Sequence, residues 1–385
     1  MDFPTIFNIN DVLPHIEGRP EFVVADRDDH IIINYVVSDN ETFPSTDTLT
    51  GRIRRECRGL IFDKATGNIV RRPYHKFFNL NEREETLSRN VDFSQPHTVY
   101  DKLDGSMIVP YIINDRLIWG TKMGDTDVAK TIHKFLAKNP QYAELAENFL
   151  RSQLCPIFEW CSRKQRIVID YPEDRLVLTA VRDMNYGMYY SHDKLIDVGN
   201  RYGVEVVDAF PYPINNVDSF VEAVRQYTTK EGVVVRFNDG NMIKVKADWY
   251  VSVHKAKESI LYDRNIVSLI LENKLDDIKS VLPDQDRVRL EKFETEVVES
   301  IDLLIERLHL ITVQYNASMK MTRKDFALSY PYGTLKSLVF AVWEKHSIDD
   351  CRTAVLNVVR KSLTSNANWS KLNEELFGVS PFNEN

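Results

Sequence analysis

Cysteine and glycine are scarce in this chain, and their distribution excludes several classes of protein. The four cysteines among 385 residues show no C-x-x-C pairing, so we expect reduced thiols and neither a disulfide scaffold nor a zinc site. Glycine is absent from Asn241 to Tyr332, and no G-x-x-x-x-G-K-[ST] phosphate loop occurs in the sequence. The missing loop counts against a kinase-like phosphotransferase of the P-loop type.

The chain also lacks long apolar runs and an excess of positive charge. No apolar run reaches about 18 residues, so we expect no helix that spans a membrane. The first residues lack a basic segment followed by an apolar one, which argues against secretion and favours a cytoplasmic protein. A net charge of −8 excludes a uniformly basic coat for nucleic acid, but a local positive field still allows an anionic substrate.

Basic residues nevertheless gather in three clusters. A cluster of this kind is, on its own, typical of a solvated face. Three clusters on either side of one candidate nucleophile, described below, favour contacts with phosphate instead. The members are Arg52, Arg54, Arg55 and Arg58, then Arg71, Arg72 and Lys76, then Arg163, Lys164 and Arg166.

The hydrophobic pattern changes along the chain. Before residue 255, short apolar runs are separated by turn signals, and pairs of runs flank residues 114–116 and 238–240, which predicts β-hairpins. From Leu290 to Ile311 apolar residues recur at steps of three and four, which predicts a long amphipathic helix. We therefore predict an α+β domain over residues 1–254 and an all-α domain over residues 255–385.

The segment Lys102-Leu103-Asp104-Gly105-Ser106 leads into an apolar, strand-like run. A loop lysine beside an acid and a glycine, with more lysines later in the chain, is the layout of an amine nucleophile that attacks a nucleotide phosphate. Asp104 would position this nucleophile or a substrate hydroxyl. Alternatively, Asp104 would only cap its own turn.

Lys244 and Lys246 are candidates for activating this amine. A lysine attacks phosphorus only when it is uncharged, and a free lysine has a pKa near 10.4. The two lysines lie two positions apart on a predicted strand and so share one face. If that face meets Lys102, the two cations would lower its pKa and bind the α-phosphate. The alternative is a pair of solvated strand lysines.

Two glutamates stand in strand-like surroundings. Glu159 interrupts the apolar run 156–160, and Glu231 precedes Gly232 and three valines. An acid that enters a buried strand must be paired or must bind a ligand. A ribose hydroxyl, hydrated magnesium or a structural salt bridge would each satisfy these carboxylates.

Four more segments form an ordered series with the Lys102 loop and the two glutamates. They are 55–59 (RECRG), 72–79 (RPYHKFFN), 120–124 (GTKMG) and 244–250 (KVKADWY). The series resembles the superfamily of covalent nucleotidyltransferases, which comprises DNA ligases, RNA ligases and mRNA capping enzymes. Within it, the chain is most similar to the bacteriophage RNA ligase 1 family, the tRNA-repair type, from about residue 30 to residue 280.

The resemblance implies a fold, a reaction and a set of ligands. The fold would be a nucleotidyltransferase catalytic domain with ATP-grasp-like antiparallel sheets, followed by a helical domain for RNA specificity. In the reaction, Lys102 would take AMP from ATP and pass it to an RNA 5′-phosphate, and a 3′-hydroxyl would then expel AMP. ATP and Mg²⁺ are the implied cofactors. The implied partner is RNA, above all tRNA, in the host cytoplasm, with neither a membrane nor an obligate protein partner.

The resemblance also implies a role for each matching residue. Catalytic roles fall to Lys102, Asp104, Lys122 and Tyr250. Contacts with ATP fall to Tyr35, Arg58, Lys76, Glu159, Glu231, Lys244 and Lys246. Asp276, in the acidic stretch 275–279, would bind magnesium, although two acids on a helix are also typical of a solvated face.

One strand departs from the superfamily pattern, and two other functions stay open. Residues 176–181 (LVLTAV) include no aromatic side chain, so adenine would pack against aliphatic groups, and the preference for ATP over GTP is left open. His75 has no assigned role. A noncovalent nucleotide- and RNA-binding module would need none of the reactive set, whereas Lys102, Glu159 and Glu231 are all present. A kinase-like phosphotransferase is disfavoured by the missing phosphate loop.

Overall fold

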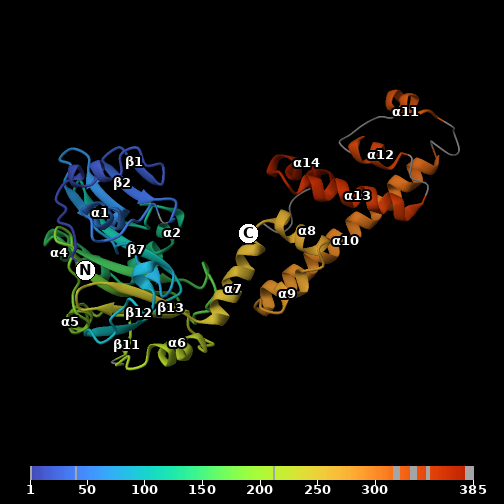
Figure 1. Cartoon of the computed structure of the whole chain (residues 1–385). Coiled ribbons are helices and arrows are strands. Elements are labelled where there is room, and N and C mark those ends of the chain that lie inside the picture. The colour runs from blue at the N-terminus through green and yellow to red at the C-terminus, as the bar shows by residue number, and fades with distance from the viewer. Residues whose placement is uncertain are drawn as a thin grey trace. The chain divides into compact units, whose positions relative to one another are not determined.

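The computed structural model describes residues 2–39, 41–210, 213–314, 321–329, 336–343 and 347–377. The chain forms two units, Met1–Val251 and Ser252–Asn385 (Figure 1). Three sheets build the first unit, and the described residues of the second unit are helical. The predicted α+β class with a helical C-terminal part is thus confirmed. The observed division and the predicted one near residue 255 both fall inside α7 (Asp248–Ser259).

The first sheet is antiparallel, with the strand order β1-β2-β3-β4. Its strands are β1 (Phe22–Asp26), β2 (His30–Tyr35), β3 (Arg58–Asp63) and β4 (Ile69–Arg71). α1 (Leu49–Glu56) begins at the N-cap Thr48, whose hydroxyl accepts a hydrogen bond from the Gly51 N–H. The Tyr35 N–H donates to the Cys57 carbonyl at 2.9 Å. This bond brings Tyr35 beside the start of β3, where Arg58 lies.

The second sheet is also antiparallel, with the order β10-β9-β7-β8. Its strands are β7 (Ser106–Ile113), β8 (Arg116–Gly120), β9 (Leu154–Cys161) and β10 (Arg175–Asp183). The predicted hairpin between β7 and β8 is confirmed. Asn114 and Asp115 have φ values of 49° and 56°, and asparagine and aspartate tolerate this conformation in two-residue turns. Glu159 on β9 pairs with Met107 on one side and Val177 on the other.

Four helices accompany the second sheet: α2 (Asp127–Thr131), α3 (His133–Lys138), α4 (Gln141–Arg151) and α5 (His192–Tyr202). Leu145 of α4 and Leu195 of α5 are fully buried in one hydrophobic core with Phe158 and Leu178 of the sheet. These apolar contacts fix one face of β9 and β10. Side chains on the opposite face, including Glu159, are left to face the rest of the unit.

The third sheet has the order β11-β6-β12-β13-β5, and only the β13–β5 pair is parallel. Its strands are β5 (Phe78–Asn79), β6 (His97–Asp101), β11 (Ala209–Phe210), β12 (Gly232–Phe237) and β13 (Met242–Lys246). The β12–β13 hairpin is confirmed as predicted. Val233, Val235 and Val245 pack in one core with residues of α6 (Val217–Arg225). Since side chains alternate along a strand, Lys244 and Lys246 lie on the opposite face.

The described part of the second unit comprises the end of α7, then α8 (Asp263–Leu271), α9 (Leu275–Lys279), α10 (Asp284–Thr312), α11 (Arg323–Ser329), α12 (Lys336–Val342), α13 (Ile348–Ser362) and α14 (Asn366–Phe377). α10 is the predicted long amphipathic helix, and Leu290, Phe293, Val297, Ile301 and Leu308 are buried along it. They pack with apolar residues of α12, α13 and α14. Every helix of the described chain is too short or too polar to cross a bilayer.

A buried ionic network ties three segments of the first unit together. Glu56, the last residue of α1, receives hydrogen bonds from both terminal nitrogens of Arg182 at 2.7 Å and from Arg72 Nε at 3.1 Å. All three side chains are fully buried. Burial would raise the pKa of Glu56, but Arg182 and Arg72 outweigh it and hold the pKa at about 2. The network fixes the start of the segment 72–79, which continues into the cavity described below.

Candidate active site

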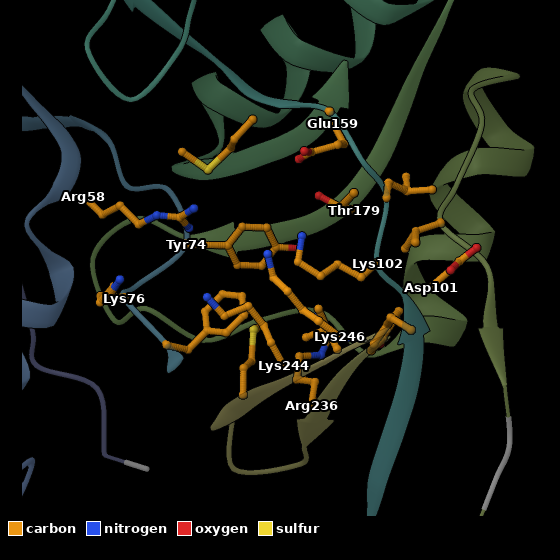
Figure 2. Close-up of a pocket in the computed structure, with 18 of the residues that line it drawn as sticks. Arg58, Tyr74, Lys76, Asp101, Lys102, Glu159, Thr179, Arg236, Lys244 and Lys246 are labelled. Atoms are coloured by element: carbon orange, nitrogen blue, oxygen red, sulfur yellow. Dashed lines mark hydrogen bonds between the residues drawn. The ribbon is translucent and has the colours of Figure 1, made fainter. Parts of the chain in front are cut away.

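The first unit contains a cavity of about 300 Å³ (Figure 2), a size typical of ligand sites. Its lining comes from the segment 74–77 and from β2, β3, β6, β7, β9, β10, β12 and β13. The sequence separates these elements by up to two hundred residues, and the fold brings them together. The basic lining residues are Arg58, Lys76, Lys102, Arg236, Lys244 and Lys246.

Lys102 lies directly after β6 and is held on both sides. Its backbone N–H donates to the Gly232 carbonyl at 3.0 Å, and a Cβ at Gly105 would lie 2.5 Å from the Trp160 carbonyl oxygen. Only glycine therefore allows the loop to pass so close to β9. The amine of Lys102 forms an ion pair with Glu231 Oε1 at 2.6 Å.

Glu231 is shared between two lysines. Its Oε1 also pairs with the amine of Lys246 at 3.0 Å, and its side chain is only 4% exposed. The next residue, Gly232, has φ 147° and lies so close to β13 that a Cβ would be 2.1 Å from the Val245 carbonyl oxygen. The sequence allowed the strand face shared by Lys244 and Lys246 to meet Lys102. The structure instead places the Glu231 carboxylate between Lys102 and Lys246.

Lys244 is a basic residue of the cavity with a strongly lowered pKa. Burial lowers its pKa to about 7, and the positive charges of Lys76, Arg58 and Lys102 act in the same direction. It faces Val234 across the β12–β13 ladder, and its amine lies 5.2 Å from the centre of the Phe77 ring. A partly dehydrated cation of this kind is stabilised most when an anion binds between these charges.

Glu159 points into the cavity toward Lys102 (Figure 2). Burial raises its pKa to about 7, opposed by Lys102 and reinforced by Glu231. Within the described residues, no group of three or more His, Cys, Asp or Glu side chains could hold a metal ion. Magnesium in nucleotide sites needs only one or two carboxylates, because water and phosphates supply the other ligands. Glu159 fits that requirement.

Tyr35 is surrounded by cations. The amines of Lys76 and Lys122 lie 5.0 Å and 5.2 Å from the centre of its ring. Burial would raise the pKa of the Tyr35 hydroxyl, but Arg58, Lys76 and Lys122 outweigh it and lower the pKa. The predicted nucleotide contacts Tyr35, Arg58 and Lys76 therefore lie together, with Lys122 next to Tyr35. Such a group is suited to bind several phosphates.

Asp104 and Tyr250 lie behind the nucleophile loop and do not line the cavity. The Tyr250 hydroxyl donates to Asp104 Oδ1 at 2.6 Å. The backbone N–H groups of Val168 and Ile169 donate to Oδ2 at 2.8 Å and 2.6 Å. The Asp104 N–H donates in turn to the Tyr171 hydroxyl at 2.9 Å. Asp104 thus ties the loop to two distant segments, and we describe both residues as positioning residues.

The expectation of phosphate contacts is wrong for Arg71 and Arg72 of the second basic cluster. Arg163, Lys164 and Arg166 of the third cluster do not line the cavity, and their contact with phosphate stays a prediction. Arg71 and Arg72 are fully buried: Arg71 Nε donates to the Gly59 carbonyl, and Arg72 belongs to the Glu56 network. Arg55 pairs with Glu85 at 2.6 Å. Of the first two clusters, only Arg58 and Lys76 line the cavity. Arg52, Arg54 and Arg55 lie on α1, whereas Arg58 is the first residue of β3.

Asp276 lies in the second unit, on α9. Its side chain is 91% exposed and pairs with Lys279 at 3.0 Å. A single exposed carboxylate of this kind resembles the solvated face that the sequence also allowed. Its role as a magnesium ligand stays a prediction.

Several cavity residues escaped the sequence analysis, and they change the expectation about the nucleobase. β10 contributes Thr179, but Tyr74, Phe77 and Tyr100 supply aromatic rings from other segments. Tyr74 and Phe77 belong to a recognised motif, so their aromatic character was an available signal. Arg236, a charged residue within the apolar run 233–237, was another available signal.

His75, which had no role, is buried with Nδ1 2.9 Å from the Tyr189 hydroxyl, and burial lowers its pKa well below the usual value.

A family model described as "RNA ligase" matches residues 56–259, which is just over half of the chain. A protein of Thermovibrio ammonificans named "Putative RNA ligase" is 29% identical over 318 residues, 77% of this chain and 78% of that protein. An RNA ligase of Rhodothermus phage RM378 is 23% identical over 319 residues, 66% of this chain and 72% of that protein. A solved RNA ligase of Naegleria gruberi matches with a TM-score of 0.36 and 19% identity, over 42% of this chain and 52% of its own.

Proposed function

The chain belongs to the RNA ligase family, and from this premise we propose that it is an ATP-dependent RNA ligase that joins 5′-phosphate and 3′-hydroxyl ends through lysyl-AMP on Lys102. One observation carries the proposal. The Lys102 amine lies in a cavity that four other basic residues of the predicted set also line, namely Arg58, Lys76, Lys244 and Lys246. A nucleophile surrounded by fixed cations is suited to attack a phosphate of a polyphosphate.

In the first step, the uncharged Lys102 amine attacks the α-phosphorus of ATP. A phosphorus–nitrogen bond forms as the nitrogen releases one proton to solvent, the bond between the α-phosphorus and the bridging oxygen breaks, and pyrophosphate leaves with that oxygen. Positioned cations carry most of the catalysis in such transfers, because charge moves onto the departing oxygens. In this proposal, Lys244 and Lys246 bind the α-phosphate, and Arg58 and Lys76 bind the leaving phosphates. Glu231 holds the amine in position before the attack.

Magnesium would neutralise charge on the phosphates and orient them. Glu159 is the cavity carboxylate that would hold the hydrated ion, because it faces Lys102 and has no ion pair within the described residues. Burial raises the pKa of Glu159 to about 7, and a bound cation would favour its ionised form.

The remaining steps use RNA as the substrate. The 5′-phosphate of one RNA end attacks the phosphorus of lysyl-AMP, the phosphorus–nitrogen bond breaks, and Lys102 regains its proton. The 3′-hydroxyl of the other end then attacks the activated 5′-phosphate and expels AMP. We further propose that the substrate is a broken tRNA in the cytoplasm and that the helical unit recognises it, because folded RNA is read mainly by shape and single-stranded loops.

A noncovalent nucleotide- and RNA-binding module is the second candidate. The Lys102–Glu231 ion pair is compatible with this candidate, because the same ion pair would also stabilise a lysine that never reacts. The shifted pKa values of Lys244 and Glu159 indicate a ligand site, but a noncovalently bound nucleotide would suit them equally. The covalent intermediate on Lys102 is therefore what separates the two candidates.

Incubation of the full-length protein with α-labelled ATP and magnesium tests the proposal. We expect label that survives denaturation of the protein in the wild type and in the control Lys64→Ala, an exposed lysine outside the cavity. Lys102→Ala should take up no label. A kinase or a noncovalent binder would leave the wild type unlabelled. A mass spectrum with adenylate on another residue would overturn the assignment of Lys102.

A further inference from the structure

One face of the third sheet forms the floor of the cavity, and its register orders the lining residues in rows. Val234 pairs with Tyr100 on one side and with Lys244 on the other. Two residues further along β12, Arg236 pairs with Met242. All five side chains line the cavity. The floor thus runs from the lysines near Lys102 to a buried arginine at the far row.

Arg236 is an unusual residue for that position. It is 7% exposed, and among the described residues no carboxylate lies within ion-pairing distance of it. Its Nη2 donates to the Tyr100 hydroxyl and to the Tyr190 carbonyl, and its guanidinium carbon lies 4.5 Å from the centre of the Tyr100 ring. A buried cation without an anionic partner costs free energy, which ring contacts offset only in part.

The other donors of Arg236 open to the cavity. Its Nε and Nη1 make no hydrogen bond with any described residue. Both nitrogens are nevertheless accessible rather than buried. Both therefore reach accessible space, and the accessible space beside Arg236 is the cavity. Tyr100 and Tyr190 fix the guanidinium plane, so the direction of these donors is set before a ligand enters.

Thr179 and two apolar residues complete the lining of the cavity. The β9–β10 register slips between Leu178 and Ala180, and this bulge leaves Thr179 to line the cavity. The Thr179 hydroxyl donates to the Ile157 carbonyl at 3.0 Å. Leu103 and Val207 line the same part of the cavity. Apolar walls with a few fixed polar groups are typical of sites for small ligands.

We propose that Arg236 recognises the nucleobase of the nucleotide, by donating to a ring-nitrogen acceptor of a purine that lies against Val207 and Val234. The inference rests on the proposed function, which places the phosphates at the lysines and therefore the base at the other end. Arginine only donates hydrogen bonds, so it faces N1, N3 or N7 and not the amino group of adenine. Guanine has acceptors at N3 and N7 but carries a proton on N1, so a contact at N3 or N7 allows GTP and a contact at N1 excludes it.

Analogues of ATP that replace one ring nitrogen by CH test this contact atom by atom. We measure the second-order rate of lysyl-AMP formation on the full-length protein with ATP and with its 1-deaza, 3-deaza and 7-deaza analogues. Removing the acceptor of a charged hydrogen bond should make one analogue about 10- to 100-fold poorer than ATP in the wild type. In Arg236→Met, that analogue and ATP should react at equal rates, whereas Arg236→Lys should keep part of the difference.

Each comparison is a ratio of two substrates on one protein preparation, so a partly unfolded variant does not distort it. Arg225→Met is the matched control, because Arg225 is exposed and lies outside the cavity. It should discriminate as the wild type does. Equal use of ATP and all three analogues by the wild type would overturn the proposal, as would discrimination that persists in Arg236→Met. Failure of the wild type to form lysyl-AMP from ATP would instead sink the proposed function.

Discussion

The Lys102 amine lies between a carboxylate and a group of cations, and both have consequences for its chemistry. The Glu231 carboxylate holds the amine in an ion pair at 2.6 Å. This ion pair also competes with the attack of the amine on phosphorus. Lys246 pairs with the same oxygen at 3.0 Å, so it can retain Glu231 when Lys102 moves away. The shared carboxylate therefore allows Lys102 to change partners without leaving a buried charge unpaired.

Asp104 and Tyr250 should affect the rate of adenylylation more than the binding of ATP. Tyr250→Phe removes one of the three donors to the buried Asp104 carboxylate, at a cost of about 1.5–3 kcal/mol. We expect lysyl-AMP formation to slow by about 10- to 100-fold, with little change in KM for ATP, because neither residue lines the cavity. Tyr186→Phe, at an exposed tyrosine, is the control. A rise in KM with an unchanged rate would argue for direct contact with ATP.

The positive charge of Lys244 should lower the free energy of unfolding most at low pH. Its pKa is about 7 when folded and 10.5 for a free lysine, so below pH 7 both states are protonated and the full cost is present. Between pH 7 and 10.5 the folded protein has released the proton, and the cost declines as pH rises. Lys244→Met should therefore raise the free energy of unfolding by roughly 2 kcal/mol at pH 6 and by less at pH 10.

Denaturant unfolding at pH 6, 8 and 10 measures this difference. Lys134→Met, at an exposed lysine of α3, should change stability little and equally at all three values. A stabilisation by Lys244→Met that grows with pH would contradict the electrostatic account. The same variant should lose most of its activity, because the charge that costs stability is the one proposed to bind the α-phosphate.

Among the elements, α1 and β10 are joined to the segment 72–79 by the Glu56 network rather than by strand pairing. Arg72 also donates to the carbonyls of Pro4 and Asn185 at 2.8 Å. Lys76 therefore depends for its position on a buried glutamate twenty residues earlier in the chain. Breaking the network should move the phosphate-binding side chains as well as destabilise the unit.

Glu56→Gln should lower the free energy of unfolding by about 3–5 kcal/mol, because two buried arginines lose their counter-charge. Glu85→Gln is a matched control: its carboxylate also pairs with an arginine, but it is 44% exposed, so we expect a loss below about 1 kcal/mol. The depressed pKa of about 2 adds a pH dependence. The stabilisation by Glu56 is present above about pH 4.5 and is lost as pH falls toward 2. Equal losses in both variants at pH 7 would contradict this reasoning.

The division of the whole chain into two units falls within α7, and this affects how the units should be separated. Tyr250 lies on α7 (Asp248–Ser259) and belongs to the site through Asp104. A cut at the predicted boundary near residue 255 would shorten that helix. A cut after Ser259 keeps it whole and removes the helices α8 to α14, whose buried residues form a core of their own.

The chain truncated after Ser259 should still form lysyl-AMP and should seal simple RNA ends better than a broken tRNA. We expect the loss of sealing rate to be at least about tenfold greater on the tRNA, which corresponds to about 1.4 kcal/mol of lost recognition. Sealing of a nicked tRNA and of a short single-stranded RNA at equal concentrations provides the measurement. Equal loss on both substrates would show that the helical unit supports the fold of the catalytic unit rather than recognition.

Local sequence was sufficient for the features that depend on neighbouring residues. The step of two between Lys244 and Lys246 predicted a shared face, because side chains alternate along any strand. Asn114 and Asp115 predicted the turn between β7 and β8, because their backbone preference is local. The apolar steps of three and four along 290–311 predicted α10 for the same reason. The order of the motifs around Lys102 indicated the family.

Contacts between distant segments decided the rest. Whether Arg72 would face phosphate or Glu56, and whether Asp104 would face ATP or Tyr250, depended on residues 16 and 146 positions away. The bulge that turns Thr179 into the cavity exists only when β9 and β10 pair. A charged or polar residue has the same local pattern whether its partner is a ligand or the protein interior. Its role is therefore set only when folding brings the partner within hydrogen-bonding distance.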